Sequence, residues 1–142
     1  MYEHLAEQAR EAGLELTWSP RIAYSRTALA AAEAVRVNEP QSHQAFNAAI
    51  FRAYFALGLD IGDWSVITKC AVDVGIDPST FESPMTSGVA DDRLRHAEAE
   101  AREHRVDATP SWLVENQLVV GLRPRAFFVT LAQALAERRP RP

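Results

Sequence analysis

The segment VDATPSWLVENQLVVGLRP, residues 106–124, constrains the fold of this chain more than any other stretch. It begins with a Thr109-Pro110 step at the end of a helical pattern. Two short apolar runs, SWLV and QLVVG, follow and predict a β-hairpin, and a new helix is expected to begin near Pro124. The C-terminal part of the chain is therefore predicted to be strand, strand and helix, in that order.

The chain before this segment consists mainly of helical patterns separated by caps and breakers. Helices are predicted over 2–12, from Ser25 to Asn38, over 41–57, from Asp63 to Gly75, after Asp77-Pro78 and over 91–106, with a short extended segment over 14–18. The helix over 41–57 carries two apolar stripes, Phe46-Ile50-Ala53-Leu57 and Phe51-Phe55. A helix that is apolar on two sides is expected to lie buried between its neighbours.

Composition limits the possible partners. The chain has 142 residues, enough for one domain with a real core, and its net charge of −4 gives no sign of a nucleic-acid-binding surface. No apolar run approaches the length of a membrane span, and no signal-peptide pattern opens the chain. We therefore expect a cytoplasmic protein that binds neither nucleic acid nor membrane.

The chain has one cysteine, Cys70, so it can form neither an intrachain disulfide nor a C-x-x-C pair. Its neighbours at helical spacing are apolar, among them Val66, Ile67 and Val74. This setting favours a small buried core residue, and a reactive thiol is the alternative.

The chain resembles the DsbA-like thioredoxin family, and specifically its cytoplasmic, FrnE-like branch. Three motifs carry the resemblance: FRAYFALGLDIGDWSVI (51–67), VDATPSW (106–112) and NQLVVGLRPRAFFVTLAQAL (116–135). A fourth, RIAYSRTALA, matches less closely, because Tyr24-Ser25 replaces the usual Asn-Thr. The resemblance implies a mostly helical α+β protein, an incomplete thioredoxin-like fold that keeps the β-β-α half and a DsbA-type helical insertion. Residues 1–142 would form one domain, with the helical part at about 25–105 and the β-β-α part at about 106–138.

The resemblance also implies a substrate-binding loop, and it implies that the residues for disulfide exchange are missing from this sequence. Ala108, Thr109 and Pro110 would form the family's cis-proline loop, which presents main-chain groups to an extended substrate. Family members carry a C-x-x-C motif on a preceding β-α-β half, which has no counterpart in this sequence. Cys70 cannot replace that motif, because the resemblance places it in the helical insertion. The family is one of protein-disulfide oxidoreductases, but no catalytic residue is expected in this chain.

Several other residue groups have a structural explanation that is simpler than a functional one. The four-residue spacing of His96, Glu100 and His104 fits a metal site less well than an exposed charged helix face, so no metal is expected. Trp112 is expected to pack, with substrate stacking as the alternative. The side chains of Tyr24 and Tyr54 are expected to be buried with satisfied hydroxyls, and hydroxyls that face a cleft between the helical cluster and the sheet are the alternative. The sequence has no phosphate loop, nucleophile elbow or zinc motif, and no cofactor is expected.

The hairpin strands are apolar on both faces, so they need cover on both sides, and a lone hairpin leaves open edges. This predicts a partner, either a second copy in a homodimer or a separate polypeptide that completes the N-terminal half. Three functions remain open: membership of a disulfide oxidoreductase system, a non-redox protein or isomerase that binds a small molecule or thiol at the cis-proline cleft, and a dimeric interaction module. A thiol or a peptide is the expected kind of ligand.

Overall fold

A computed structural model describes residues 2–17 and 22–138. The chain divides into two compact units, one from Met1 to Ala97 and the other from Glu98 to Pro142, and each is described by itself. The segment Leu14–Thr17, expected to be extended, is irregular and forms no strand, while Trp18 lies outside the described residues.

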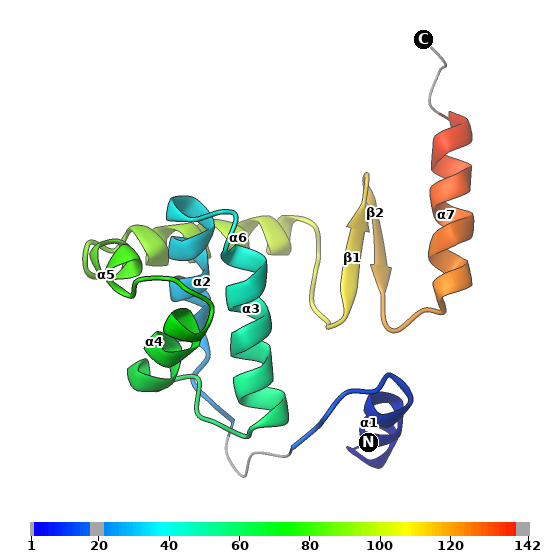
Figure 1. Ribbon diagram of the computed structural model, residues 1–142. Coiled ribbons are helices and arrows are strands. Elements are labelled where there is room, and N and C mark those ends of the chain that lie inside the picture. Colours follow the sequence, from blue (N-terminus) through cyan, green and yellow to red (C-terminus); the bar gives the residue numbers. More distant parts are fainter. Residues whose placement is uncertain (1, 18–21, 139–142) are drawn as a thin grey trace. The chain divides into compact units, whose positions relative to one another are not determined.

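The first unit is helical (Figure 1). Its elements are α1 (Tyr2–Glu11), α2 (Arg26–Asn38), α3 (His43–Phe51), a π-helical turn η1 (Arg52–Ala56), α4 (Trp64–Asp73), α5 (Ser79–Thr86) and the first part of α6 (Val89–Glu103). No helix among the described residues is long and apolar enough to cross a bilayer.

Short polar side chains and glycine set the ends of α4 and the start of α5. The Asp63 carboxylate accepts a hydrogen bond of 2.8 Å from the Ser65 N–H, so the predicted cap of α4 is confirmed. The Asp77 carboxylate accepts the Ser79 N–H at 3.0 Å, and this bond holds the pKa of Asp77 below its usual value. Gly75 ends α4 in the left-handed region at φ 80°, a conformation that glycine adopts at little cost.

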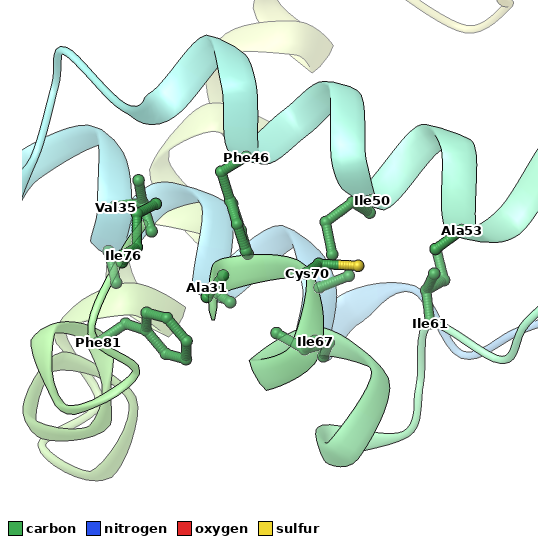
Figure 2. Packing of buried hydrophobic residues seen from close by; sticks show 13 residues of the cluster. Ala31, Val35, Phe46, Ile50, Ala53, Ile61, Ile67, Cys70, Ile76 and Phe81 are labelled. Atoms are coloured by element: carbon green, nitrogen blue, oxygen red, sulfur yellow. The ribbon is translucent and has the colours of Figure 1, made fainter. Parts of the chain in front are cut away.

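The core of the first unit lies between α2, α3, α4 and α5 (Figure 2). Small alanines on α2 let the neighbouring helices approach closely. The rings of Phe46 and Phe81 are both fully buried, with centroids 6.0 Å apart. The main cluster of buried residues comprises Ala28, Ala31, Ala34, Val35, Phe46, Ile50, Ala53, Ile61, Ile67, Cys70, Ala71, Ile76 and Phe81.

The helix predicted over 41–57 differs from expectation in its last turn. The first stripe is buried through Ala53, but Leu57, predicted to continue it, is 52% exposed. The π-helical turn changes the number of residues per turn at Arg52–Ala56, so the regular spacing no longer applies there. The second stripe is not buried either: Phe51 and Phe55 stack on each other at 5.7 Å and are 62% and 44% exposed.

The second unit contains the predicted hairpin and final helix. Strands β1 (Ser111–Val114) and β2 (Gln117–Val120) are antiparallel, with Trp112 opposite Val119 and Leu113 opposite Leu118. Helix α7 (Arg125–Arg138) follows, and its Phe128 ring meets the Trp112 ring edge-on at 4.8 Å. The two-stranded sheet and the mostly helical remainder agree with the predicted fold class.

Candidate functional site

The C-terminal end of α6 sets the entry to the Ala108-Thr109-Pro110 loop. The Arg105 N–H bonds the Arg102 carbonyl at 3.0 Å, and the Val106 N–H bonds the Ala101 carbonyl at 2.8 Å. These two bonds form a Schellman motif with Arg105 in the left-handed region at φ 57°. The motif ends α6 at Glu103, five residues before Ala108.

The loop is anchored on one side and open on the other. The Ser111 hydroxyl donates to the Ala108 carbonyl at 2.5 Å, and the Gly121 N–H donates to the Pro110 carbonyl at 2.9 Å. The Thr109–Pro110 peptide bond is cis. Ala108 and Thr109 are exposed and Pro110 is half-buried. The sequence-predicted residues thus lie together immediately before β1.

The main chain of this region can accept another extended chain. Because Gly121 bonds Pro110, the alternation of an antiparallel ladder directs the N–H and C=O groups of Ser111 and Leu113 away from β2. Within the described part of the chain, neither main-chain group of Thr109 has a hydrogen-bonding partner. Unpaired donors and acceptors along the edge of a strand are what β-strand addition uses, and here the outward groups of Ser111 and Leu113 on β1 supply them, with Thr109 in the bend that precedes the strand.

Cys70 is not at this loop. It lies on α4 in the first unit, where it is 7% exposed and belongs to the main core cluster (Figure 2). Burial raises the pKa of its thiol, and the nearby Asp73 carboxylate adds to the increase. A thiol held protonated is a poor nucleophile, so the core interpretation of Cys70 is confirmed.

Three other sets of candidate residues can be located in the structure. His96 and Glu100 are exposed on α6, and His104 is exposed in the turn that follows it. No three potential ligands among the described residues are placed to hold a metal ion. Trp112 packs on Phe128, as the packing interpretation predicted. Tyr24 is 70% exposed, so its predicted burial is wrong, whereas Tyr54 is half-buried against the core cluster.

Sequence reasoning missed an apolar cavity in the first unit. It has a volume of about 310 Å³ and lies beside the exposed pair Phe51 and Phe55. Its other lining residues are Ile22, Ala23, Ser25, Ala28, Leu29, Ala32, Asn47, Ile50, Tyr54 and Ile61. The apolar pattern of 41–57 was visible, but a sequence pattern does not distinguish an apolar surface from a core.

Three comparisons relate the chain to known proteins. The profile of the family described as DSBA-like thioredoxin domain matches residues 1–133. A curated relative, "Uncharacterized protein YwbO" of Bacillus subtilis (strain 168), is 29% identical over 84 residues; the match covers 58% of this chain and 42% of the relative. The match thus spans less than half of that relative's length.

A solved structure, described as a "putative protein disulfide isomerase" from Nitrosomonas europaea, aligns with a TM-score of 0.82 at 22% sequence identity. The alignment covers 98% of this chain and 73% of that one. This likeness shows a shared fold, and about a quarter of that chain has no counterpart here.

Proposed function

This chain belongs to the family of DSBA-like thioredoxin domains, and from that membership we propose that it is a polypeptide-binding member of a disulfide oxidoreductase system with no redox activity of its own. The observation that carries the proposal is Thr109, an exposed residue two positions before β1 whose main-chain N–H and C=O have no hydrogen-bonding partner within the described part of the chain. Ala108, Thr109 and Pro110 form the binding loop.

The position of the single cysteine, Cys70, is why we propose that this chain binds a polypeptide but does not itself exchange disulfides. Disulfide exchange requires a thiolate that attacks a disulfide sulfur. The single cysteine of the chain is Cys70, which is buried and whose pKa is raised. The loop can therefore align an unfolded polypeptide, but the attacking sulfur has to come from a C-x-x-C motif on another polypeptide or on chain beyond this sequence.

The proposal includes a partner and a location. A two-stranded hairpin with an open edge is marginal by itself, which supports either a second copy or a completing polypeptide. We propose that the protein is cytoplasmic. A chain with one cysteine forms no intrachain disulfide, so its stability does not require an oxidising compartment.

Binding is tested by NMR with reduced and alkylated insulin B chain as an unfolded, thiol-free probe. We expect shifts at the amides of Ala108 and Thr109, and a loss of affinity of about tenfold in Pro110→Ala, because the proline ring fixes the backbone of the loop. Thr109→Val keeps the main chain and should bind normally, as should the control Pro124→Ala. Shifts that leave 108–113 unchanged would refute the binding site.

Redox activity is tested separately by insulin reduction with dithiothreitol. The chain alone should not accelerate the reaction above the uncatalysed rate. Acceleration that survives Cys70→Ala would contradict the proposed absence of redox activity.

A further inference from the structure

We infer that a second cavity of the first unit binds a medium-chain aliphatic carboxylate, with the carboxylate paired to Arg52 and the chain lying on aliphatic side chains. The cavity is lined by residues of α3, η1 and α4 and has a volume of about 740 Å³, within the range of sites that hold small molecules. All of its lining residues belong to the first unit, so this inference does not depend on the proposed function.

The lining of this cavity is mainly aliphatic. Ala45 and Ala49 of α3 border it on one side and Val66 of α4 on the other, and no aromatic side chain is among the described residues that line it. Its most buried lining residues are Ala53 and Cys70, which are 2% and 7% exposed (Figure 2). Small side chains and the absence of a ring for stacking favour a narrow aliphatic chain over a planar aromatic molecule.

Arg52 brings a positive charge to the edge of this lining. Its side chain is exposed and, within the described part of the chain, its guanidinium has no hydrogen-bonding or ion-pair partner. The other charged residues that border the cavity, Lys69 and Asp73, pair with each other at 2.9 and 3.0 Å, so their charges offset. One unbalanced positive charge beside an aliphatic lining is complementary to an aliphatic chain with a single anionic group.

The charge of the site favours a carboxylate over a phosphate. A carboxylate carries one negative charge, and the planar guanidinium can donate two parallel hydrogen bonds to it. A phosphate monoester carries a charge of about −1.5 to −2 at pH 7, and the second cation of this cavity, Lys69, is already paired with Asp73. The expected ligand is therefore a monoanion.

The π-helical turn explains why leucine side chains also lie at this cavity. The Leu57 N–H bonds the Arg52 carbonyl at 3.1 Å, so Leu57 follows Arg52 by one π turn and does not continue the buried stripe of α3. Leu57 and Leu59 both border the cavity and are 52% and 39% exposed. Turns of this kind are frequent at functional sites, and a bound aliphatic chain would cover these leucines.

The length of the lining indicates the length of the chain. From Ala45 to Arg52 the helix rises by about 10 Å, the length of an extended chain of about eight carbons. We therefore choose octanoate as the probe, with 1-octanol as its uncharged counterpart and octyl phosphate as its phosphate counterpart.

The test is an NMR titration of the full chain, labelled at its alanine methyl groups, with each of the three probes below its micelle-forming concentration. Octanoate should shift the methyl signals of Ala45, Ala49 and Ala53 and leave those of Ala126 and Ala132 on α7 unchanged. It should bind about tenfold more tightly than 1-octanol, because only octanoate forms the charged pair with Arg52. Octyl phosphate should bind more weakly than octanoate.

The matched variants are Arg52→Gln and Arg93→Gln, which remove the same charge at the cavity and at an exposed position of α6 outside it. Arg52→Gln should weaken octanoate binding about tenfold and leave 1-octanol binding unchanged, so that the two probes bind equally. Arg93→Gln should alter neither affinity. Ala49→Leu, which occupies part of the cavity, should weaken both probes, and its urea unfolding midpoint shows whether it is folded.

Four results would overturn the inference. Shifts of similar size at Ala126 and Ala132 would show non-specific association with apolar surface. Equal affinities of the wild type for octanoate and 1-octanol would remove the role of Arg52, and tighter binding of octyl phosphate would contradict the carboxylate. Shifts at Ala45 and Ala49 that grow with protein concentration in the absence of a probe would assign the cavity to a second copy of the chain.

Discussion

At the scale of single residues, Cys70 shows how burial separates a cysteine from cysteine chemistry. Its side chain shares the core with Ile67 and Ala71 of the same helix. A thiolate there would lose its hydration without gaining a comparable partner, which is why its pKa is raised. A residue type that defines the family's activity elsewhere is here a packing residue.

Cys70 should react slowly with iodoacetamide in the folded protein. At pH 8 we expect alkylation at least about tenfold slower in buffer than in denaturant, because the thiol is both inaccessible and protonated. Mass spectrometry of quenched samples measures the two rates. Equal rates would show that the thiol is exposed.

The raised pKa of Cys70 also predicts the pH dependence of stability. As pH rises above about 8.5, the unfolded chain releases the thiol proton while the folded chain retains it, so the free energy of unfolding should fall. The decrease ends once pH passes the folded pKa. Urea titrations of the wild type and Cys70→Ala at several pH values measure it, and an equal slope in both proteins would exclude Cys70 as its origin.

Arg105 occupies a backbone conformation that suits glycine. At φ 57° it ends α6 in the way that Gly75, at φ 80°, ends α4. Arg105→Gly should therefore stabilise the local structure by about 1 kcal/mol, since a left-handed conformation costs other residues about 1–2 kcal/mol. Amide exchange at the end of α6 measures the effect. Arg102→Gly, inside the last turn of the same helix, is the control and should destabilise.

At the scale of elements, the sequence predicted helix boundaries well where a side chain or glycine sets them. Asp63 and Gly75 are local signals, because the capping bond and the left-handed turn involve only nearby residues. The exposure of Phe51, Phe55 and Leu57 was not predictable in this way. It depends on which tertiary neighbours cover a helix face, and a pattern within one helix does not contain that information.

Removal of the α4 cap should have a measurable cost. Asp63→Ala leaves the Ser65 N–H without its acceptor, so we expect a loss of about 1 kcal/mol in the free energy of unfolding. Asp73→Ala is the matched control at the other end of α4, where the exposed pair with Lys69 is worth at most a few tenths of a kcal/mol. Chemical denaturation of both variants gives the comparison, and similar losses would contradict the capping role.

The predictable part of the candidate site is similarly local. Thr109-Pro110 before an apolar hairpin was sufficient to place the loop, and the structure puts Ala108, Thr109 and Pro110 together. The outward direction of the Ser111 and Leu113 main-chain groups was not predictable. It requires the strand register, which is set by the bond between Gly121 and Pro110.

At the scale of the whole molecule, the two units differ in how many of their residues are buried. The first unit has a large buried cluster containing Phe46 and Phe81. In the second unit, no residue from Glu98 to Glu137 reaches full burial, and its sheet has two strands. The domain prediction of a single unit over 1–142 remains a prediction, because compactness alone does not decide whether the two units unfold together.

We expect the two units to differ in amide protection. Helices α3 and α4 should exchange only on global unfolding, whereas β1 and β2 should open locally at a lower free energy, since a two-stranded sheet is marginal in water. Hydrogen exchange under increasing denaturant measures both. One common opening free energy for both units would show that they unfold cooperatively.

The π-helical turn Arg52–Ala56 has a consequence for tolerance of changes in chain length. A π turn holds one more residue than the α-helical turn it replaces, so it is equivalent to a single-residue insertion absorbed within a helix. Loss of one residue there would return the segment to α-helical geometry and leave Phe46 and Ile50 in place. The same loss earlier in α3 would rotate every later side chain by about 100° and remove the core contacts. The helix thus has one turn, Arg52–Ala56, in which its length can change by a residue while Phe46 and Ile50 keep their places in the core.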